Sequence, residues 1–459
     1  MSDLAARGLR LRHRDHARPG GRRDAVWLHR GARGLALGAV LCMTGWPMVA
    51  CSDAVSRSSL PVAPATPATA PRLPAIDRFL ADATGPHGYP GAVALVIHEG
   101  RTVHAASYGW QDLAHTRPMQ QDSIFRIYSM TKTVASVAAL MLVDDGKLGL
   151  DDPVARHLPE FSQLQLFIGG SADAPQLRPL STTLTVRHLL THTSGFAAGG
   201  EGFEAVTQLL EQHRVRDVGS LAAYSTRLAQ VPLATEPGTH FRYDSTSTET
   251  LSRLVEVVAG VPFEQFLQQR IFEPLAMHDT GFEVPPAQRA RAVELSVMGA
   301  DGKLALADEP HTRDPGTALR PYRSGAGGLY STAADYGRFA QMLLDGGRYQ
   351  DRQLLQPATV ALMLQNQLAH FPLPKPVTEF SDAEGFGLGG SVLLDPALKG
   401  RRAAAGAFGW SGAASTYYTI EPDRKLLAIL LLQHLPGGEN DLPRISTAFY
   451  NLVDEALQP

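Results

Sequence analysis

Two groups of strand-like segments lie far apart in this 459-residue chain, and they constrain its fold more than any other feature. Near the start, residues 91–110 (GAVALVIHEGRTVHAASYGW) predict two strands joined by a tight turn. Near the end, residues 407–422 (AFGWSGAASTYYTIEP) and 425–433 (KLLAILLLQ) predict two paired strands. The sequence between these groups is mostly helical or loop-like. The sequence therefore predicts an α+β fold, in which both ends of the folded part build one sheet.

The folded domain is predicted to span residues 76–459. Its sheet is expected to come from residues of about 76–149 and 322–459, and a helical insertion from about 150–321. The net charge of −3 and the 19% of charged residues favour no nucleic acid partner. We expect a small-molecule substrate instead.

The first 75 residues are predicted to lie outside this domain. Residues 1–51 have the layout of a secretory signal: a basic region, an apolar run and small residues before Cys51. The ending MVAC resembles a bacterial lipobox, so we expect a lipid anchor on Cys51; the alternative is an ordinary cleaved signal. Residues 52–75 are rich in Pro and Ala and predict an extended tether. Because Ser52 follows the cysteine, we expect the bacterial cell envelope, with the outer membrane favoured over the soluble periplasm.

The segment RIYSMTKTVASVAALMLVDDG places Ser129 and Lys132 three residues apart at the start of an apolar helix. Residues i and i+3 share a helix face, so the hydroxyl and the amine are expected to be neighbours. A serine hydroxyl needs a base to become a nucleophile, and a buried lysine can act as one whereas arginine cannot. The alternative is a helix-capping serine followed by a surface lysine.

Other motifs favour no metal or cofactor. His188 and His192 have helical spacing, but HLLTH lacks the Glu of a zinc-protease helix, so a structural role is expected. The run GFGLGG at residues 385–390 is not followed by a predicted helix, so it is not interpreted as a dinucleotide site. The sequence also lacks a G-x-S-x-G elbow, which argues against an α/β-hydrolase.

Five segments, in this order, resemble the serine β-lactamase-related superfamily of class C-like proteins, and most closely its family VIII carboxylesterases. They are FRIYSMTKTVASVAALMLVDDGKLGLDDPV, TVRHLLTHTSGF, PGTHFRYDS, GVPFEQFLQQRIFEPLAMHDTGF and GAGGLYSTAADYGRFAQMLLDGG. The resemblance implies an antiparallel sheet flanked by helices, a mostly helical second domain, and an active site in the cleft between them.

The resemblance also implies roles for individual residues. Ser129 is expected to be the acylated nucleophile, Lys132 its activating partner and Tyr243 the proton shuttle. A phenol acts as a shuttle only where a nearby cation stabilises its phenolate, and Lys132 is the expected cation. The common Asn of the family's tyrosine motif is Ser245 here, which puts its hydrogen bonding to substrate in doubt.

A strand facing the serine carries K-T-G in β-lactamases, and here the resemblance aligns it with Trp410, Ser411 and Gly412. Tryptophan offers an apolar wall and one N–H donor but no cation for a carboxylate. The resemblance implies an oxyanion hole from the backbone N–H groups of Ser129 and Ala413. The alternative reading of Trp410 is simple packing within the sheet.

The sequence therefore predicts a serine hydrolase that forms an acyl-enzyme at Ser129, most simply a carboxylesterase for small esters. The first alternative is a β-lactamase or a D-amino-acid-specific peptidase of the same fold, against which the absent cation at position 410 counts. The second is a non-catalytic penicillin-binding or cell-wall sensor lipoprotein.

Overall fold

The computed structural model describes residues 72–196, 202–373, 381–437 and 441–457, which belong to one compact unit. The predicted signal segment, the lipidation site Cys51 and the tether up to residue 71 lie outside the described residues. Among the described helices, none has the length and apolar character needed to cross a membrane.

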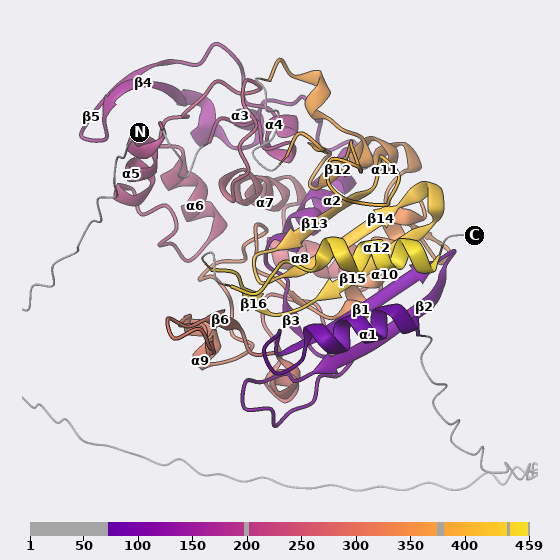
Figure 1. The fold of residues 1–459 in the computed structure, drawn as a ribbon. Coiled ribbons are helices and arrows are strands. Elements are labelled where there is room, and N and C mark those ends of the chain that lie inside the picture. The colour runs from indigo at the N-terminus through magenta and orange to yellow at the C-terminus, as the bar shows by residue number, and fades with distance from the viewer. Residues whose placement is uncertain (1–71, 197–201, 374–380, 438–440, 458–459) are drawn as a thin grey trace, which may run out of the picture. The chain divides into compact units, whose positions relative to one another are not determined.

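A seven-stranded antiparallel sheet forms the centre of this unit, in the order β11-β12-β13-β14-β15-β1-β2 (Figure 1). Strand β1 pairs with β15, with Leu95 opposite Ile429, so the two ends of the folded part meet in mid-sheet. This confirms the α+β fold predicted from the sequence. The strands are β1 (Gly91–His98), β2 (Arg101–Gly109), β11 (Glu384–Phe386), β12 (Ser391–Leu393), β13 (Phe408–Gly412), β14 (Thr416–Glu421) and β15 (Leu426–Leu431).

One prediction about this sheet was wrong. Residues 407–422 form two strands rather than one, because the chain reverses between Gly412 and Thr416. Ser415 lies in that turn with a φ of 56°, a left-handed conformation that ends a strand. The reversal leaves the C-terminal half of β13 beyond the short partner β12, whose pairing reaches only to Gly409.

Helices cover both faces of the sheet. Successive side chains of a strand point to opposite faces, and here the side chains on both faces are apolar. On one face Ala94 and Val96 pack against α1 (Pro74–Ala83) and α12 (Ser446–Ala456), which lie side by side (Figure 1). On the other face Val93 belongs to the main core with α2 (Thr131–Asp144), α10 (Ala333–Leu344) and α11 (Pro357–Leu364). Helix α1 begins at Pro74, so the folded part starts two residues before the predicted boundary at residue 76.

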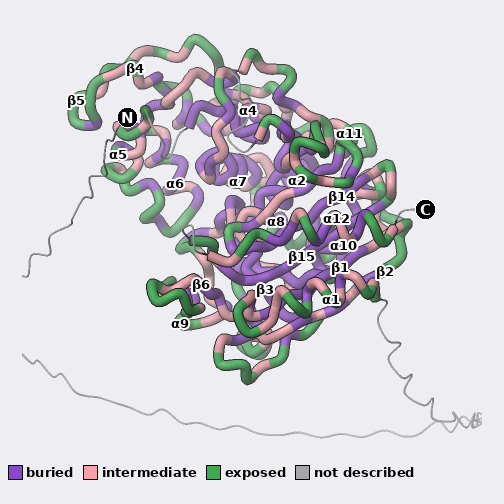
Figure 2. The backbone as a smooth tube through the Cα atoms, in the orientation of Figure 1, coloured by how far each residue is buried: buried purple, intermediate pink, exposed green. Residues whose placement is uncertain are grey.

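Helix α2 is the central helix of the domain. Its residues from Thr131 to Leu142 are all buried, as an apolar helix enclosed on every side should be (Figure 2). It packs against α7 (Thr246–Ala259). The helix that carries Lys132 is therefore rigidly held, and its first turn is a fixed platform for side chains.

Residues 150–321 form short helices joined by long loops, and they also hold two hairpins that the sequence did not predict. Strands β4 and β5 pair with each other, and β6 and β7 pair beside β16. The bounds are α3 (Val154–His157), β4 (Gln165–Ser171), β5 (Ala174–Pro179), α4 (Val186–Leu190), α5 (Glu204–Gln212), α6 (Leu221–Leu228), α8 (Phe263–Leu267), β6 (Ser296–Met298), β7 (Leu304–Leu306) and α9 (Pro310–Arg313). The remaining short strands are β3 (Phe125–Arg126), β8 (Tyr330–Ser331), β9 (Arg348–Tyr349), β10 (Arg352–Gln353) and β16 (His434–Leu435).

Candidate active site

Ser129 and Lys132 lie together where the chain enters α2. Ser129 is in a single 3₁₀ turn, Tyr128–Met130, that leads directly into the helix. Lys132 Nζ lies 3.2 Å from Ser129 Oγ and donates a second hydrogen bond to the backbone oxygen of Ala326 at 2.7 Å. Lys132 is only 2% exposed, whereas Ser129 is half-buried. The neighbouring hydroxyl and amine expected from their spacing are therefore present, and the reading of Lys132 as a surface residue is wrong.

The residue before Ser129 has an unusual backbone. Tyr128 has a φ of 41°, which a bulky residue adopts only under strain of about 1–3 kcal/mol. Its hydroxyl lies 3.2 Å from Nε2 of His311, whose pKa burial lowers to about 4. A neutral His311 can accept a hydrogen bond from the phenol. The sequence contained no signal for this strained turn.

Tyr243 lies over the amine and beside the indole of Trp410. Lys132 Nζ is 4.9 Å from the centre of the Tyr243 ring, and Trp410 Nε1 donates to the Tyr243 hydroxyl at 3.1 Å. The two aromatic rings are 4.9 Å apart. Trp410 also packs edge-on against Phe386 at 5.1 Å, so it is both a packing residue and a hydrogen-bond donor to Tyr243. The structure therefore brings Ser129, Lys132, Tyr243 and Trp410 into one cluster.

Of the two histidines singled out in the sequence, His192 contacts this cluster and His188 caps α4. His192 follows α4, and its ring lies 4.8 Å from that of Tyr243 while Nδ1 accepts from the Asp244 backbone N–H at 3.4 Å. His188 accepts from the Thr185 N–H at 3.1 Å in a capping box at the start of α4. The positions of both rings fit the structural role expected for them. Within the described residues, no group of three or more His, Cys, Asp or Glu side chains is arranged to hold a metal ion.

A cavity of about 560 Å³ opens over the cluster. Its lining includes the predicted residues Ser129, Tyr243, Trp410, Ser411, Gly412 and Ala413. Gly412 is required for close approach, because a Cβ there would lie 2.3 Å from the Ile127 backbone oxygen. Strand β13 thus runs directly beside the turn that carries Ser129.

Ser245 is placed differently from the other predicted residues. It is the residue immediately before α7, makes no side-chain capping bond, and is not among the described residues that line this cavity. The structure therefore does not place Ser245 in the cavity lining with the other predicted residues.

The lining of this cavity also includes three cations that the sequence did not single out. Lys399 forms an ion pair with Glu384, and Arg444 Nε donates to Ser446 Oγ at 3.1 Å. The third is Arg401, whose side chain is 9% exposed; its guanidinium lies 4.3 Å from the Tyr450 ring. These residues come from the loop before β13 and from the segment around the start of α12, so no short motif could have revealed their proximity to Ser129.

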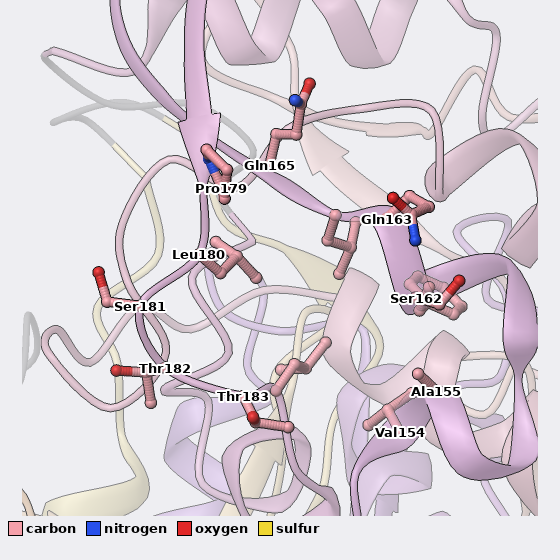
Figure 3. A pocket seen from close by; sticks show the side chains of 13 residues that line it. Val154, Ala155, Ser162, Gln163, Gln165, Pro179, Leu180, Ser181, Thr182 and Thr183 are labelled. Atoms are coloured by element: carbon pink, nitrogen blue, oxygen red, sulfur yellow. The ribbon is translucent and has the colours of Figure 1, made fainter.

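A second hollow, of about 310 Å³, lies between α3, β4 and the segment after β5 (Figure 3). Its thirteen lining residues, Leu180 and Thr183 among them, include no ionisable side chain. It therefore has no acid–base chemistry to offer, and the cavity beside Ser129 is the better candidate for catalysis.

Comparisons with known proteins agree with this fold. Residues 76–448 match the family model described as Beta-lactamase. The chain is 32% identical over 357 residues to Protein Rv1367c of Mycobacterium tuberculosis (strain ATCC 25618 / H37Rv), covering 75% of this chain and 86% of that protein. It is 30% identical over 364 residues to Esterase EstB of Burkholderia gladioli, covering 74% and 85%.

Among solved structures, the fold is similar to that of EstCE1, described as a hydrolase with promiscuous acyltransferase activity. The TM-score is 0.69 at 24% identity, over 84% of this chain and 98% of that one. The family model spans almost the whole described unit, and esterases are among the relatives. The chain therefore belongs to the beta-lactamase family, and an esterase is among its relatives.

Proposed function

We propose that this protein is a carboxylesterase that works through an acyl-enzyme at Ser129. The observation that carries the proposal is the 3.2 Å approach of the buried Lys132 amine to the Ser129 hydroxyl. A neutral amine at this distance can take the hydroxyl proton while Oγ bonds to the ester carbonyl carbon. The backbone N–H groups of Ser129 and Ala413 stabilise the resulting oxyanion.

Tyr243 completes the proton path in this proposal. As the tetrahedral intermediate collapses, the ester C–O bond breaks and the leaving alkoxide takes a proton from the Tyr243 hydroxyl, which Lys132 replaces. The Trp410 N–H and the nearby Lys132 cation both favour the transient phenolate. Water then attacks the acyl-enzyme by the reverse sequence, which releases the acid and regenerates Ser129.

Trp410 supports an uncharged ester over a β-lactam as substrate. Its indole occupies the position aligned with the cation that β-lactamases direct at a substrate carboxylate, and its N–H is already bonded to Tyr243. The other cations in the cavity lining contact neighbouring groups: Lys399 pairs with Glu384, Arg444 bonds to Ser446, and Arg401 lies 3.7 Å from Glu421. Position 410 itself therefore offers no cation to a substrate carboxylate.

A parallel hydrolysis panel tests the proposal. It compares short-chain p-nitrophenyl esters, nitrocefin and D-alanyl peptides on the wild type and on Ser129→Ala. We expect kcat/KM on the best ester to exceed that on nitrocefin by at least about 100-fold, the equivalent of one lost charged contact. Comparable values on both substrates would favour a β-lactamase, and a folded protein inactive on all three would favour a penicillin-binding sensor.

Transfer of the acyl group to an alcohol is a second candidate. The observation in its favour is the relative EstCE1, whose description includes promiscuous acyltransferase activity. Adding a primary alcohol to the ester assay distinguishes the two outcomes. A new ester product that grows at the expense of free acid would show that an alcohol competes with water for the acyl-enzyme.

We also propose that the protein is held at the bacterial envelope by lipid on Cys51. The MVAC sequence before Ser52 supports this, and several acyl chains on one cysteine anchor a protein stably. Cys51→Ser is expected to move the protein from the membrane fraction to the soluble fraction, or to block its maturation. Unchanged partition on fractionation would favour an ordinary cleaved signal.

A further inference from the structure

A carboxyl group is buried on α7, the helix that packs against α2. Glu249 lies in the first turn of α7 and is 2% exposed. Its Oε1 accepts hydrogen bonds from the hydroxyls of Ser324 and Tyr322, the latter at 3.3 Å. Oε2 is buried and has no hydrogen-bond partner among the described residues. A carboxyl in such a place is unfavourable unless a nearby positive charge compensates it.

Glu249 is linked to Lys132 through the short backbone segment 324–326. Ser324 is two residues before Ala326, and the Ala326 backbone oxygen is the acceptor that holds Lys132 Nζ at 2.7 Å. Between them, Gly325 is packed so tightly against α7 that an added Cβ would lie 1.9 Å from Ser252 Oγ. The segment 324–326 is therefore clamped between α7 and the amine on α2, and Glu249 fixes its first residue.

The electrostatic surroundings of Glu249 point the same way. Burial raises the pKa of its carboxyl, while the Ser324 hydroxyl and the positive charge of Lys132 oppose that rise. The other groups that face it are Tyr224 from α6, and Arg320 and Tyr322 from the segment before β8. Burial and the charge of Glu249 raise the pKa of both tyrosines, so both remain neutral, and Tyr322 donates to Glu249.

We propose that Glu249 is the buried counter-ion of Lys132 and a positioning residue for it. Through Ser324 it fixes the backbone oxygen that holds the amine, and its negative charge favours the ammonium form of that amine. A buried amine without a counter-ion gives up its proton readily but accepts one poorly. The proposal rests on the function of Lys132 proposed above, because a base that also acts as an acid needs a proton affinity matched to both steps.

A titration of Lys132 itself tests this without relying on turnover. The chain has only six lysines, so ¹³Cε labelling gives few NMR signals, and the one missing in Lys132→Arg identifies Lys132. Replacing Glu249 by Gln removes the charge and keeps the shape. We expect the Lys132 midpoint to fall by about one pH unit, because an opposite charge nearby stabilises the ammonium form. The acidic limb of kcat/KM for ester hydrolysis is expected to move down with it.

Glu256→Gln is the matched control. This glutamate is on the same helix, but its carboxylate bonds to Arg253 and to the Phe263 backbone N–H. The Lys132 midpoint is expected to stay unchanged in this variant. An unchanged midpoint in a folded Glu249→Gln protein would overturn the proposal.

Should Glu249→Gln fail to fold, as judged by its thermal melt, Ser324→Ala decides. Removing this hydroxyl destabilises the carboxylate form of Glu249 and breaks its connection to the segment that ends at Ala326. We therefore expect the Lys132 midpoint to fall, but by less than in Glu249→Gln. No fall would again overturn the proposal. The test is separate from that of the function. A wild type that titrates as expected but neither hydrolyses esters nor reacts at Ser129 would contradict the esterase proposal and leave the counter-ion intact.

Discussion

The candidate site consists of two pairs of residues that are built in different ways. Ser129 and Lys132 are three residues apart, and their 3.2 Å approach follows from the geometry at the start of one buried helix. Tyr243 and Trp410 are 167 residues apart, and their 3.1 Å hydrogen bond exists only because the start of α7 and the free end of β13 meet. The first pair is a local arrangement, and the second is a product of the tertiary fold.

The two pairs also differ in their exposure to the cavity. Lys132 is almost fully buried, whereas Tyr243 and Trp410 are partly exposed and line the cavity. We infer that the helix pair, Ser129 and Lys132, provides the nucleophile and the base. In the tertiary pair, Tyr243 donates the proton to the leaving group and Trp410 selects the substrate. The variants below are ordered from the largest expected loss to the smallest, and each tests one part of this division.

Lys132→Arg tests the helix pair and is expected to have the largest effect. It keeps the charge and the helix propensity, but guanidinium cannot accept a proton, so kcat/KM on a p-nitrophenyl ester should fall by about 1,000-fold. Lys147→Arg, the same change just after α2, is the control and should leave activity unchanged. If Lys132→Arg remained close to wild type, the residue would act as a positive charge and not as a base.

Tyr243→Phe tests the tertiary pair. It keeps the ring over Lys132 and removes only the hydroxyl that relays the proton, so we expect a loss of about 100-fold in kcat/KM. The loss should be smaller for esters with better leaving groups, which need less protonation. Tyr349→Phe in β9 is the control. Equal losses for good and poor leaving groups would argue against a proton relay.

Trp410→Phe is expected to lower ester kcat/KM by about tenfold, because it keeps an aromatic wall but removes the N–H bond to Tyr243. Trp410→Lys should narrow the gap between ester and nitrocefin, mainly through a lower rate on the ester. Trp110→Phe controls for the loss of an indole elsewhere. An unchanged ester-to-nitrocefin ratio in Trp410→Lys would show that this position does not select the substrate.

His188 belongs to neither pair, so His188→Ala should have the smallest effect on activity. The ring caps α4, so its loss should lower the free energy of unfolding by about 1 kcal/mol and reduce the melting temperature. Turnover is expected to stay close to the wild-type value. A selective loss of turnover without a change in melting temperature would mean that the α4 cap belongs to the catalytic site.

The difference between a local pair and a tertiary pair also explains which parts of the site could be predicted from the sequence. The i, i+3 spacing placed Ser129 beside Lys132. This is a property of a few consecutive residues, so no knowledge of the rest of the fold was needed. Tyr243 came from a family resemblance and not from its spacing.

What the sequence did not reveal depends on contacts between distant segments. The strained φ of Tyr128 occurs where Gly412 of β13 approaches the backbone just before α2. Glu249 is one polar residue in a polar run, TSTETLS, and reads as solvent-exposed until Ser324 and Tyr322 enclose it. The break between β13 and β14 was missed because Ala and Ser in the turn lack the usual Gly or Pro signal.

Mass spectrometry of the protein quenched during ester turnover tests the central claim most directly. We expect the mass to rise by that of the acyl group, on the peptide that contains Ser129, and a fluorophosphonate probe to modify the same residue. Ser129→Ala should show neither modification while its melting temperature stays close to that of the wild type. Acylation of a different residue, or unchanged ester hydrolysis by Ser129→Ala, would contradict the account.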